Sequence, residues 1–231
     1  ALMGRELSVQ TQLKEIEDKR SKAQKDATKE LEKQQKVLQV NAKVQANAAK
    51  YNFNGFETKH GLPSGLLSGV HMQEARGDAS AVGPMTKYGT AKGGFQFLDG
   101  TAKRFGLTGD DVFDLGKSAE AAAKYFQYLY KKFGNWDEAI SAYHAGEGNV
   151  AAGTGIGPIN RQYVKNVKGY TAGVNGYTGS SKDFDSGMGD QTKYAQKTLD
   201  EISQLQSQFD TEAIQRSKER DEQINQATIL G

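Results

Sequence analysis

One glutamate in this sequence stands where acid–base chemistry would be possible. Glu74 ends an apolar segment, G-L-L-S-G-V-H-M-Q-E-A, that the spacing of its apolar residues predicts to be a helix. An acid at this place lies at the negative end of the helix dipole and follows a face that should be buried. Both effects favour the protonated carboxyl group, which a general acid needs in order to protonate a leaving oxygen. Taken alone, however, a glutamate at a helix end is more often a surface residue.

Four further residues could assist such a reagent. Gln96 follows two glycines, which allow the backbone to approach a ligand closely. Tyr143 and His144 end a predicted helix immediately before a Gly-x-Gly turn. Tyr163 lies in a later predicted helix, and its hydroxyl could reach toward Glu74. Each of these residues has an equally good interpretation as a core or turn residue when it is considered alone.

The elements that would position these residues are mainly helical. Helices are predicted from Pro63 to Glu74, from Ala102 to Phe105, after the N-cap Ser118 to Phe133, after the N-cap Asn135 to Ala145, and from Pro158 to Gly169. The glycine-rich stretch 77–94 is too irregular for a long helix, and no segment alternates well enough for a long strand. The sequence therefore predicts a mainly α core with loops on one side.

The composition changes sharply on both sides of this core. All 3 prolines and 25 of the 27 glycines lie between Tyr51 and Gly189. We therefore expect a polar helical arm at 1–50, a globular domain at 51–180 and a second polar helical arm at 181–231. The first arm has a net charge of +4 and the second a net charge of −4.

Each arm has a weak apolar stripe at helical spacing. In the first arm the stripe follows Val9, Leu13, Ile16, Arg20, Ala23, Ala27, Leu31, Gln34, Leu38 and Ala42. In the second arm it follows Ala195, Leu199, Ile202, Leu205, Phe209 and Ala213. The arms could pair with each other, with arms of a second copy or with other proteins, or they could be solvated helices. Surface ion pairs are weak, so apolar contact would have to supply most of the affinity.

Several classes of protein are excluded by composition. With 0 cysteines, the chain has neither disulfides nor a thiolate zinc site, and its 3 histidines have no zinc-like spacing. No apolar run is long enough for a transmembrane helix, and no secretory signal opens the sequence. The basic arm is interleaved with acids and has no aromatic residues, so it has no nucleic-acid signature. We expect no metal and no cofactor.

The order of several motifs carries a family resemblance. These are G-L-P-S-G-L-L at 61–67, E-A at 74–75, G-G-F-Q-F-L-D-G-T-A at 93–102, F-G-N-W-D-E-A-I-S-A-Y at 133–143, A-Y-H-A-G-E-G-N-V at 142–150 and Q-Y-V-K-N-V at 162–167. As an ensemble they resemble the soluble lytic transglycosylase (SLT) catalytic domain, of the goose-type branch of the lysozyme superfamily. The resemblance covers about residues 52–170 and neither arm, and it implies a lysozyme-like helical fold.

The resemblance also implies an activity. The family cleaves the β-1,4 bond between N-acetylmuramic acid and N-acetylglucosamine in peptidoglycan. Glu74 would be its single catalytic acid and base, and Tyr163 would be the tyrosine that hydrogen-bonds near it. The glycan groove would be lined by Phe95, Gln96, Tyr143 and His144.

This sequence departs from the family pattern at three places. Ala75 replaces the usual serine after the glutamate, which leaves the fine tuning of the acid open. The motif commonly written G-L-M-Q reads G-G-F-Q. His144 replaces the usual asparagine. Because histidine can donate or accept a hydrogen bond, it could keep part of that role, and its charge could influence Glu74.

A single carboxyl group suffices if the substrate supplies the other half of the reaction. Ordinary glycosidases use two carboxylates, and no second acid here has the context of Glu74. The family mechanism uses the 2-acetamido group of the sugar and yields a 1,6-anhydromuramyl product. A lysozyme-type hydrolase and a catalytically silent glycan-binding module in a structural virion protein remain as alternatives.

The setting of the domain indicates where it would act. Long polar helices around a murein lyase, without cysteine or signal peptide, are similar to phage virion proteins that breach the wall as the genome enters the cell. We therefore expect a virion protein that acts in the bacterial periplasm and cell wall. The alternative is a periplasmic enzyme whose signal has been removed.

Overall fold

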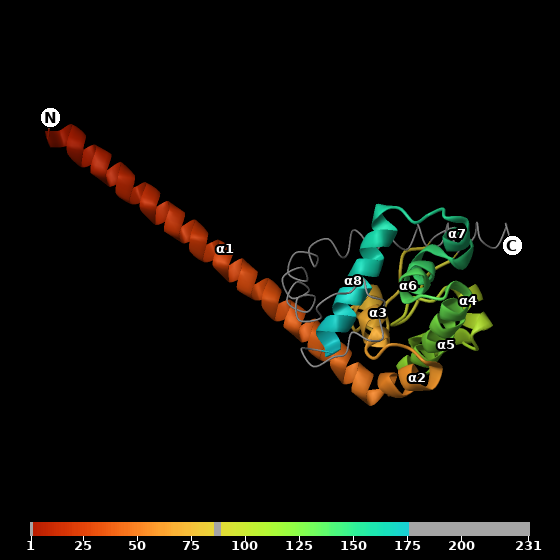
Figure 1. Ribbon diagram of the computed structural model, residues 1–231. Coiled ribbons are helices and arrows are strands. Elements are labelled where there is room, and N and C mark those ends of the chain that lie inside the picture. Colours follow the sequence, from red (N-terminus) through yellow and green to blue (C-terminus); the bar gives the residue numbers. More distant parts are fainter. Residues whose placement is uncertain (1, 86–88, 176–231) are drawn as a thin grey trace.

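The computed structural model describes residues 2–85 and 89–175 (Figure 1). Its helices are α1 (Leu2–Lys50), α2 (Phe53–His60), α3 (Leu66–Ala75), α4 (Asp99–Arg104), the 3-10 helix η1 (Gly109–Phe113), α5 (Leu115–Phe133), α6 (Trp136–Ala145), α7 (Glu147–Ala152) and α8 (Pro158–Asn175). Within these ranges β-structure is limited to two isolated bridges, Val82–Lys92 and Lys92–Phe97. The predicted mainly α fold is confirmed, whereas the second arm, 181–231, lies outside the described residues.

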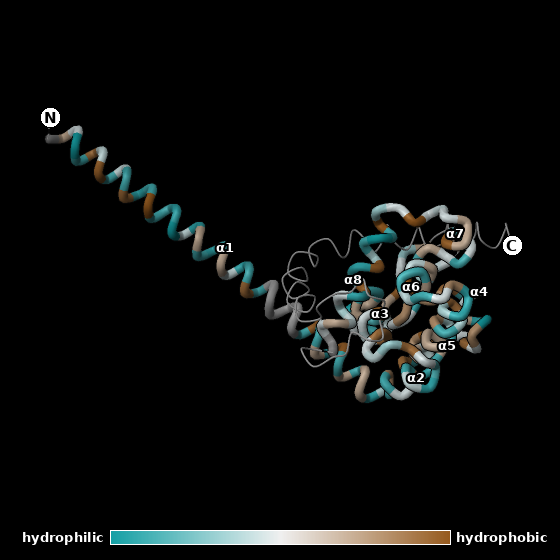
Figure 2. Tube along the Cα trace, viewed as in Figure 1, coloured by the Kyte–Doolittle hydropathy of each residue, from teal (hydrophilic) through white to brown (hydrophobic). Residues whose placement is uncertain are grey.

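Helix α1 is a long rod that projects from the rest of the molecule (Figure 1). Its 49 residues correspond to a length of about 70 Å at the usual helical rise. Hydrophilic residues interrupt the apolar ones along the helix (Figure 2). The stripe residues Val9, Leu13 and Ile16 are about half exposed. No helix in the part of the chain that the structure describes is both long and apolar enough to span a membrane.

The inner end of α1 packs against the domain. Val44 is 0% exposed and clusters with Met72 of α3 and Tyr170 of α8, with Val40 packed against the group. The stripe drawn from the sequence placed Ala42 on the packed face, but Ala42 is exposed. The stripe is therefore wrong at this end, because two valines bury more apolar surface than the alanine between them.

Helix α3 forms the centre of the domain and packs most extensively against α8. Leu66, Leu67 and Val70 of α3 are 0% exposed. A Cβ atom at Gly69 would lie 2.3 Å from Thr171 Oγ1 and 2.9 Å from the carbonyl oxygen of Val167. Glycine at this position therefore allows α3 and α8 to approach closely enough for their side chains to meet further along.

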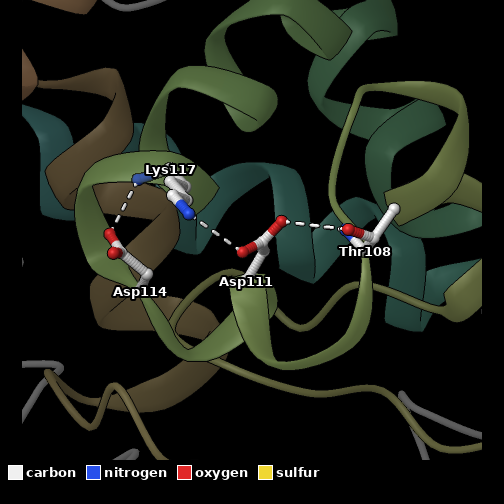
Figure 3. A network of polar contacts seen from close by, with 4 residues as sticks. All are labelled: Thr108, Asp111, Asp114 and Lys117. Atoms are coloured by element: carbon white, nitrogen blue, oxygen red, sulfur yellow. Dashed lines mark hydrogen bonds and ion pairs between the residues drawn. The ribbon is translucent and has the colours of Figure 1, made fainter.

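The beginning of α5 differs from the prediction. The helix begins at Leu115, where Asp114 accepts a hydrogen bond from the Lys117 backbone nitrogen at 3.0 Å. The predicted N-cap, Ser118, is buried inside the helix, so that prediction is wrong. Asp111 extends the network, since it accepts from Lys117 Nζ and from the Thr108 backbone nitrogen (Figure 3). Burial of Leu115, which is 3% exposed, holds the first turn in the core.

The ends of α6 agree with the prediction, and α8 runs further than predicted. Asn135 caps α6 by accepting from the Glu138 backbone nitrogen at 2.8 Å, and the helix stops before Gly146. Helix α8 begins at Pro158 as predicted but continues past Gly169. Its close packing on α3 outweighs the cost of about 1 kcal/mol for each of its two internal glycines, Gly169 and Gly173. Helices α2 and α7 were not predicted.

Candidate active site

Glu74 lies in the last turn of α3 and is partly exposed. Its Oε1 accepts a hydrogen bond from the Tyr163 hydroxyl at 2.8 Å. Tyr163 belongs to α8 and is 1% exposed, so its ring is fixed by packing while its hydroxyl reaches the carboxyl group. The contact expected between these two residues is therefore present, although they are 89 positions apart.

The Tyr163 ring is held by a stack of polar residues behind it. It stacks on the ring of His144, with centroids 4.6 Å apart and planes 18° apart. His144 Nδ1 lies 2.8 Å from Asn160 Nδ2, while Asn160 Oδ1 accepts from the Ser141 hydroxyl. Since Asn160 Nδ2 is a donor, His144 Nδ1 accepts, and the neutral ring carries its proton on Nε2. His144 is 1% exposed and supports Tyr163 through its ring.

Gln96 holds the loop that follows α3. Its Nε2 donates to the carbonyl oxygens of Ala81 at 3.1 Å and Gly93 at 2.9 Å, which uses both N–H groups. The residue has a positive φ of 52°, which is uncommon for a side chain other than glycine. Its amide therefore fixes the loop, and its contact with a glycan stays a prediction.

The two glycines before Gln96 are required for a different purpose from the one that the sequence suggested. A Cβ atom at Gly93 would lie 1.9 Å from the Val112 carbonyl oxygen. One at Gly94 would lie 2.5 Å from Leu115 Cδ2 and 2.8 Å from His71 Cε1. The pair therefore lets the loop pack against its own chain, where the sequence had suggested close approach of a ligand.

Phe95 and Tyr143 are core residues. The Phe95 side chain is 0% exposed and stacks on His71 with a centroid distance of 5.4 Å. Its expected place in the lining of the groove is therefore wrong, because the loop turns this ring inward. Tyr143 is 3% exposed, stacks on Phe126 and donates its hydroxyl to the Phe95 carbonyl oxygen at 2.6 Å. Tyr143 thus supports the loop from below, and a direct sugar contact by it stays a prediction.

Sequence reasoning missed His71, which is 0% exposed in α3. Its Nδ1 lies 2.8 Å from the Gly94 carbonyl oxygen, and its Nε2 lies 3.1 Å from Asn47 Nδ2. Burial lowers the pKa of the His71 imidazole below its ordinary value. The sequence could have indicated that His71 lies near the site, because His71 stands one helical turn before Glu74.

Glu57 of α2 was also missed. Its two carboxyl oxygens accept from the backbone nitrogens of Gly65 at 3.0 Å and Leu67 at 2.8 Å, at the start of α3. Burial raises the pKa of Glu57 to about 7, against the lowering effect of these two hydrogen bonds. The sequence could have indicated such a residue, because P-S-G-L-L has no side chain that caps the helix at Gly65. The free backbone N–H groups at the start of α3 therefore need an acceptor from another part of the chain.

The site as a whole presents one carboxyl group that is both partly exposed and hydrogen-bonded by a fixed hydroxyl. Such a group can give a proton to a bound molecule and take one back. Among the residues described, no three histidine, aspartate or glutamate side chains converge as a metal site would require. The chemistry that these residues can supply is therefore proton transfer by Glu74.

Comparison with known proteins agrees with this geometry. Residues 51–155 match the family model of the transglycosylase SLT domain, a match that includes Glu74, Gln96 and His144 but ends before Tyr163. No solved structure matched the chain. Residues 51–155 of this helical, lysozyme-like fold therefore form a transglycosylase SLT domain, which supports a function directed at peptidoglycan.

Proposed function

We propose that this protein is a peptidoglycan lytic transglycosylase that cleaves the bond between N-acetylmuramic acid and N-acetylglucosamine. The single observation that carries the proposal is the hydrogen bond of 2.8 Å from the Tyr163 hydroxyl to Glu74 Oε1. It joins a partly exposed acid within the SLT match, residues 51–155, to a buried, immobilised donor on α8, which lies just beyond that match. An inert glycan-binding module would have no need to orient one carboxyl group in this way.

In the proposed reaction Glu74 acts first as acid and then as base. The protonated carboxyl group gives its proton to the glycosidic oxygen, and the bond from that oxygen to the anomeric carbon of the muramyl residue breaks. The oxygen of the 2-acetamido group bonds to the anomeric carbon and stabilises it. The C6 hydroxyl then displaces this oxygen, and Glu74 takes the hydroxyl proton. The ring closes as a 1,6-anhydro sugar, and no water is consumed.

The mass of the released muropeptides tests this proposal. Purified protein is incubated with isolated murein, and the soluble products are analysed by mass spectrometry. We expect products one water lighter than the corresponding reducing muropeptides, and release of these products about a thousandfold more slowly by Glu74→Gln. Glu15→Gln, an exposed glutamate on α1, serves as the matched control and should behave as wild type. Reducing products would favour a hydrolase, and equal activity of Glu74→Gln would refute the assignment of Glu74.

We further propose that the protein is carried in a phage virion and opens the cell wall as the genome enters the cell. The long polar helix α1 and the absence of cysteine support this proposal, since a chain without disulfides can unfold and pass a narrow conduit more easily. Antibodies against α1 should then label purified virions. Detection of the protein only in the periplasm of uninfected cells would contradict this proposal.

We propose that the outer part of α1 binds other polypeptides, either a second copy or other virion proteins. The exposed side chains of Val9, Leu13, Ile16 and Leu31 support this, because they follow the helical spacing of the stripe and are 49 to 58% exposed. Light scattering of wild type and of a Leu13→Glu, Ile16→Glu variant tests it. A single mass for both at all concentrations would contradict self-association.

A further inference from the structure

The last turn of α1 reaches the polar centre of the domain through Asn47. Asn47 Nδ2 lies 3.1 Å from His71 Nε2 and 2.9 Å from the carbonyl oxygen of Gly77. The carbonyl oxygen can only accept, so the amide nitrogen faces both partners and donates one N–H to each. Asn47 thus joins α1 to α3 and to the chain immediately beyond α3.

His71 transmits this contact to the next loop. Its Nδ1 lies 2.8 Å from the carbonyl oxygen of Gly94, which requires a proton on Nδ1 and leaves Nε2 as an acceptor for Asn47. The two ends of the ring therefore specify the same neutral tautomer independently. Burial is the largest influence on the pKa of this ring and lowers it, whereas the hydrogen bond to the Gly94 carbonyl oxygen raises it. Of the nearby charges, Lys43 of α1 lowers the pKa and Asp78 raises it.

Asn47 is itself held firmly. Val44, three positions earlier, is 0% exposed in the cluster with Met72 and Tyr170. The stem of Lys43 covers Gly77, where a Cβ atom would lie 3.2 Å from Lys43 Cγ. The last turns of α1 are therefore a fixed part of the domain, although the family match begins only at residue 51.

These contacts bracket the proposed acid. His71 stands one helical turn before Glu74 on α3, and Gly77 stands three positions after it. We propose that Asn47 is a positioning residue for the reaction at Glu74: through His71 and the Gly77 carbonyl it fixes the end of α3 and the loop that carries Gln96. The inference rests on the function proposed for Glu74, and it adds a residue of the arm to the machinery of the domain.

Two variants of the full chain test this role. Asn47→Asp keeps the shape but replaces the donor with an acceptor, which favours a protonated His71. Asn47→Ala removes the donor without adding a charge. Gln45→Ala, an exposed residue two positions away on α1, is the matched control. The first readout is the imidazole nitrogen and proton NMR signals of His71, which must be resolved from those of only two other histidines. The second readout is the rate of murein clearance as a function of pH.

We expect wild type and Gln45→Ala to show the Nδ1–H tautomer of His71. In Asn47→Asp the ring should be protonated at a pH at which the wild-type ring is neutral. The rate at saturating murein should fall about tenfold in both Asn47 variants, as misplacement of a catalytic group predicts. In Asn47→Asp the acidic limb of the rate profile should also move to higher pH. The half-saturating murein concentration should change little, because Asn47 is placed behind the site.

Three results would overturn the inference. The first is an unchanged His71 tautomer and titration in Asn47→Asp. The second is an unchanged rate and pH profile in both variants. The third is a lower melting temperature with normal rates at temperatures where the variants are folded, since that describes a merely structural residue. If wild-type protein releases no muropeptides, the proposed function itself fails, and the NMR experiment still reports on the contact.

Discussion

Two glutamates occupy the opposite ends of α3, and the same helix gives them different surroundings. Glu57 reaches the beginning of the helix from α2, is 2% exposed, and accepts from the backbone nitrogens of Gly65 and Leu67. Glu74 lies at the other end, is partly exposed, and accepts from the Tyr163 hydroxyl. One carboxyl group is bound entirely by the protein, whereas the other keeps a side open to a substrate.

The comparison shows that an unusual pKa alone does not identify a catalytic acid. The positive end of the helix dipole and two backbone donors favour the anion of Glu57, yet burial prevails and raises its pKa to about 7. Such a value is what general acid catalysis requires near neutral pH. Glu57 cannot meet a polysaccharide, however, because its side chain is enclosed. Access and the direction of the carboxyl group therefore favour Glu74 over Glu57 as the proposed general acid.

The largest expected effect is on the rate of Glu74→Gln. Removing a general acid typically costs between a hundredfold and ten-thousandfold, and we expect about a thousandfold slower clearance of murein, or about 4 kcal/mol in the barrier. The amide oxygen can still accept from Tyr163, so the melting temperature should stay within about 2 °C of wild type. Initial rates and calorimetry measure the two quantities. A comparable rate loss in Glu57→Gln would break the distinction between the two glutamates.

The second effect is on the pH dependence of stability, through Glu57. Its pKa is raised on folding, so the native state binds the proton more tightly than the unfolded state does. The contribution of Glu57 protonation to the free energy of unfolding is complete below about pH 4.5 and is lost as the pH rises through about 7. This contribution amounts to about 3 kcal/mol at most. Urea denaturation of wild type and Glu57→Gln at pH 5, 6, 7 and 8 measures it. A difference between the two proteins that does not vary with pH would contradict this prediction.

Tyr163→Phe should have an intermediate effect, confined to activity. The variant loses the 2.8 Å donor to Glu74 but keeps the ring that stacks on His144. Hydrogen bonds to charged groups contribute about 1.5–3 kcal/mol, so we expect clearance about tenfold to a hundredfold slower. Tyr130→Phe, on the exposed side of α5, is the control. Wild-type rates in Tyr163→Phe would mean that Glu74 needs no orienting donor.

Asp114→Ala should have the smallest effect and sharpens the contrast between two ways of capping a helix. Asp114 caps α5 from the adjacent position in the chain, whereas Glu57 serves α3 across eight residues. Loss of a local cap costs about 1 kcal/mol of unfolding free energy, with activity unchanged. Asp110→Ala, an exposed acid of η1, is the control for charge. A loss of unfolding free energy well above that of Glu57→Gln at pH 5 would reverse the expected ranking.

The features that could be predicted from sequence are those that short stretches determine. Asn135 and Gly146 bound α6 because capping chemistry depends on neighbouring residues. The same rule failed at Ser118, because burial of Leu115 extends α5 by one turn and gives the cap to Asp114. In the same way, the packing of α8 on α3 carries that helix past Gly169.

The residues of the candidate site also differ in how far the sequence could identify them. Glu74 and Tyr163 could be identified by the order of motifs, and the structure brings them together. Asn47, His71 and Glu57 are not marked as site residues by those motifs, because each acts on backbone groups or on a side chain of another helix. The inward turn of Phe95 follows from packing against His71, which no local pattern encodes.

The length of α1 affects how the size of this protein should be measured. From Met3 to Glu32, where every residue is exposed, the rod extends about 45 Å. Such a projection increases friction with the solvent far more than it increases mass. A monomer of 25.1 kDa should therefore elute from a gel-filtration column as early as a larger globular protein does. In the ultracentrifuge the same monomer should sediment as slowly as a smaller globular protein does.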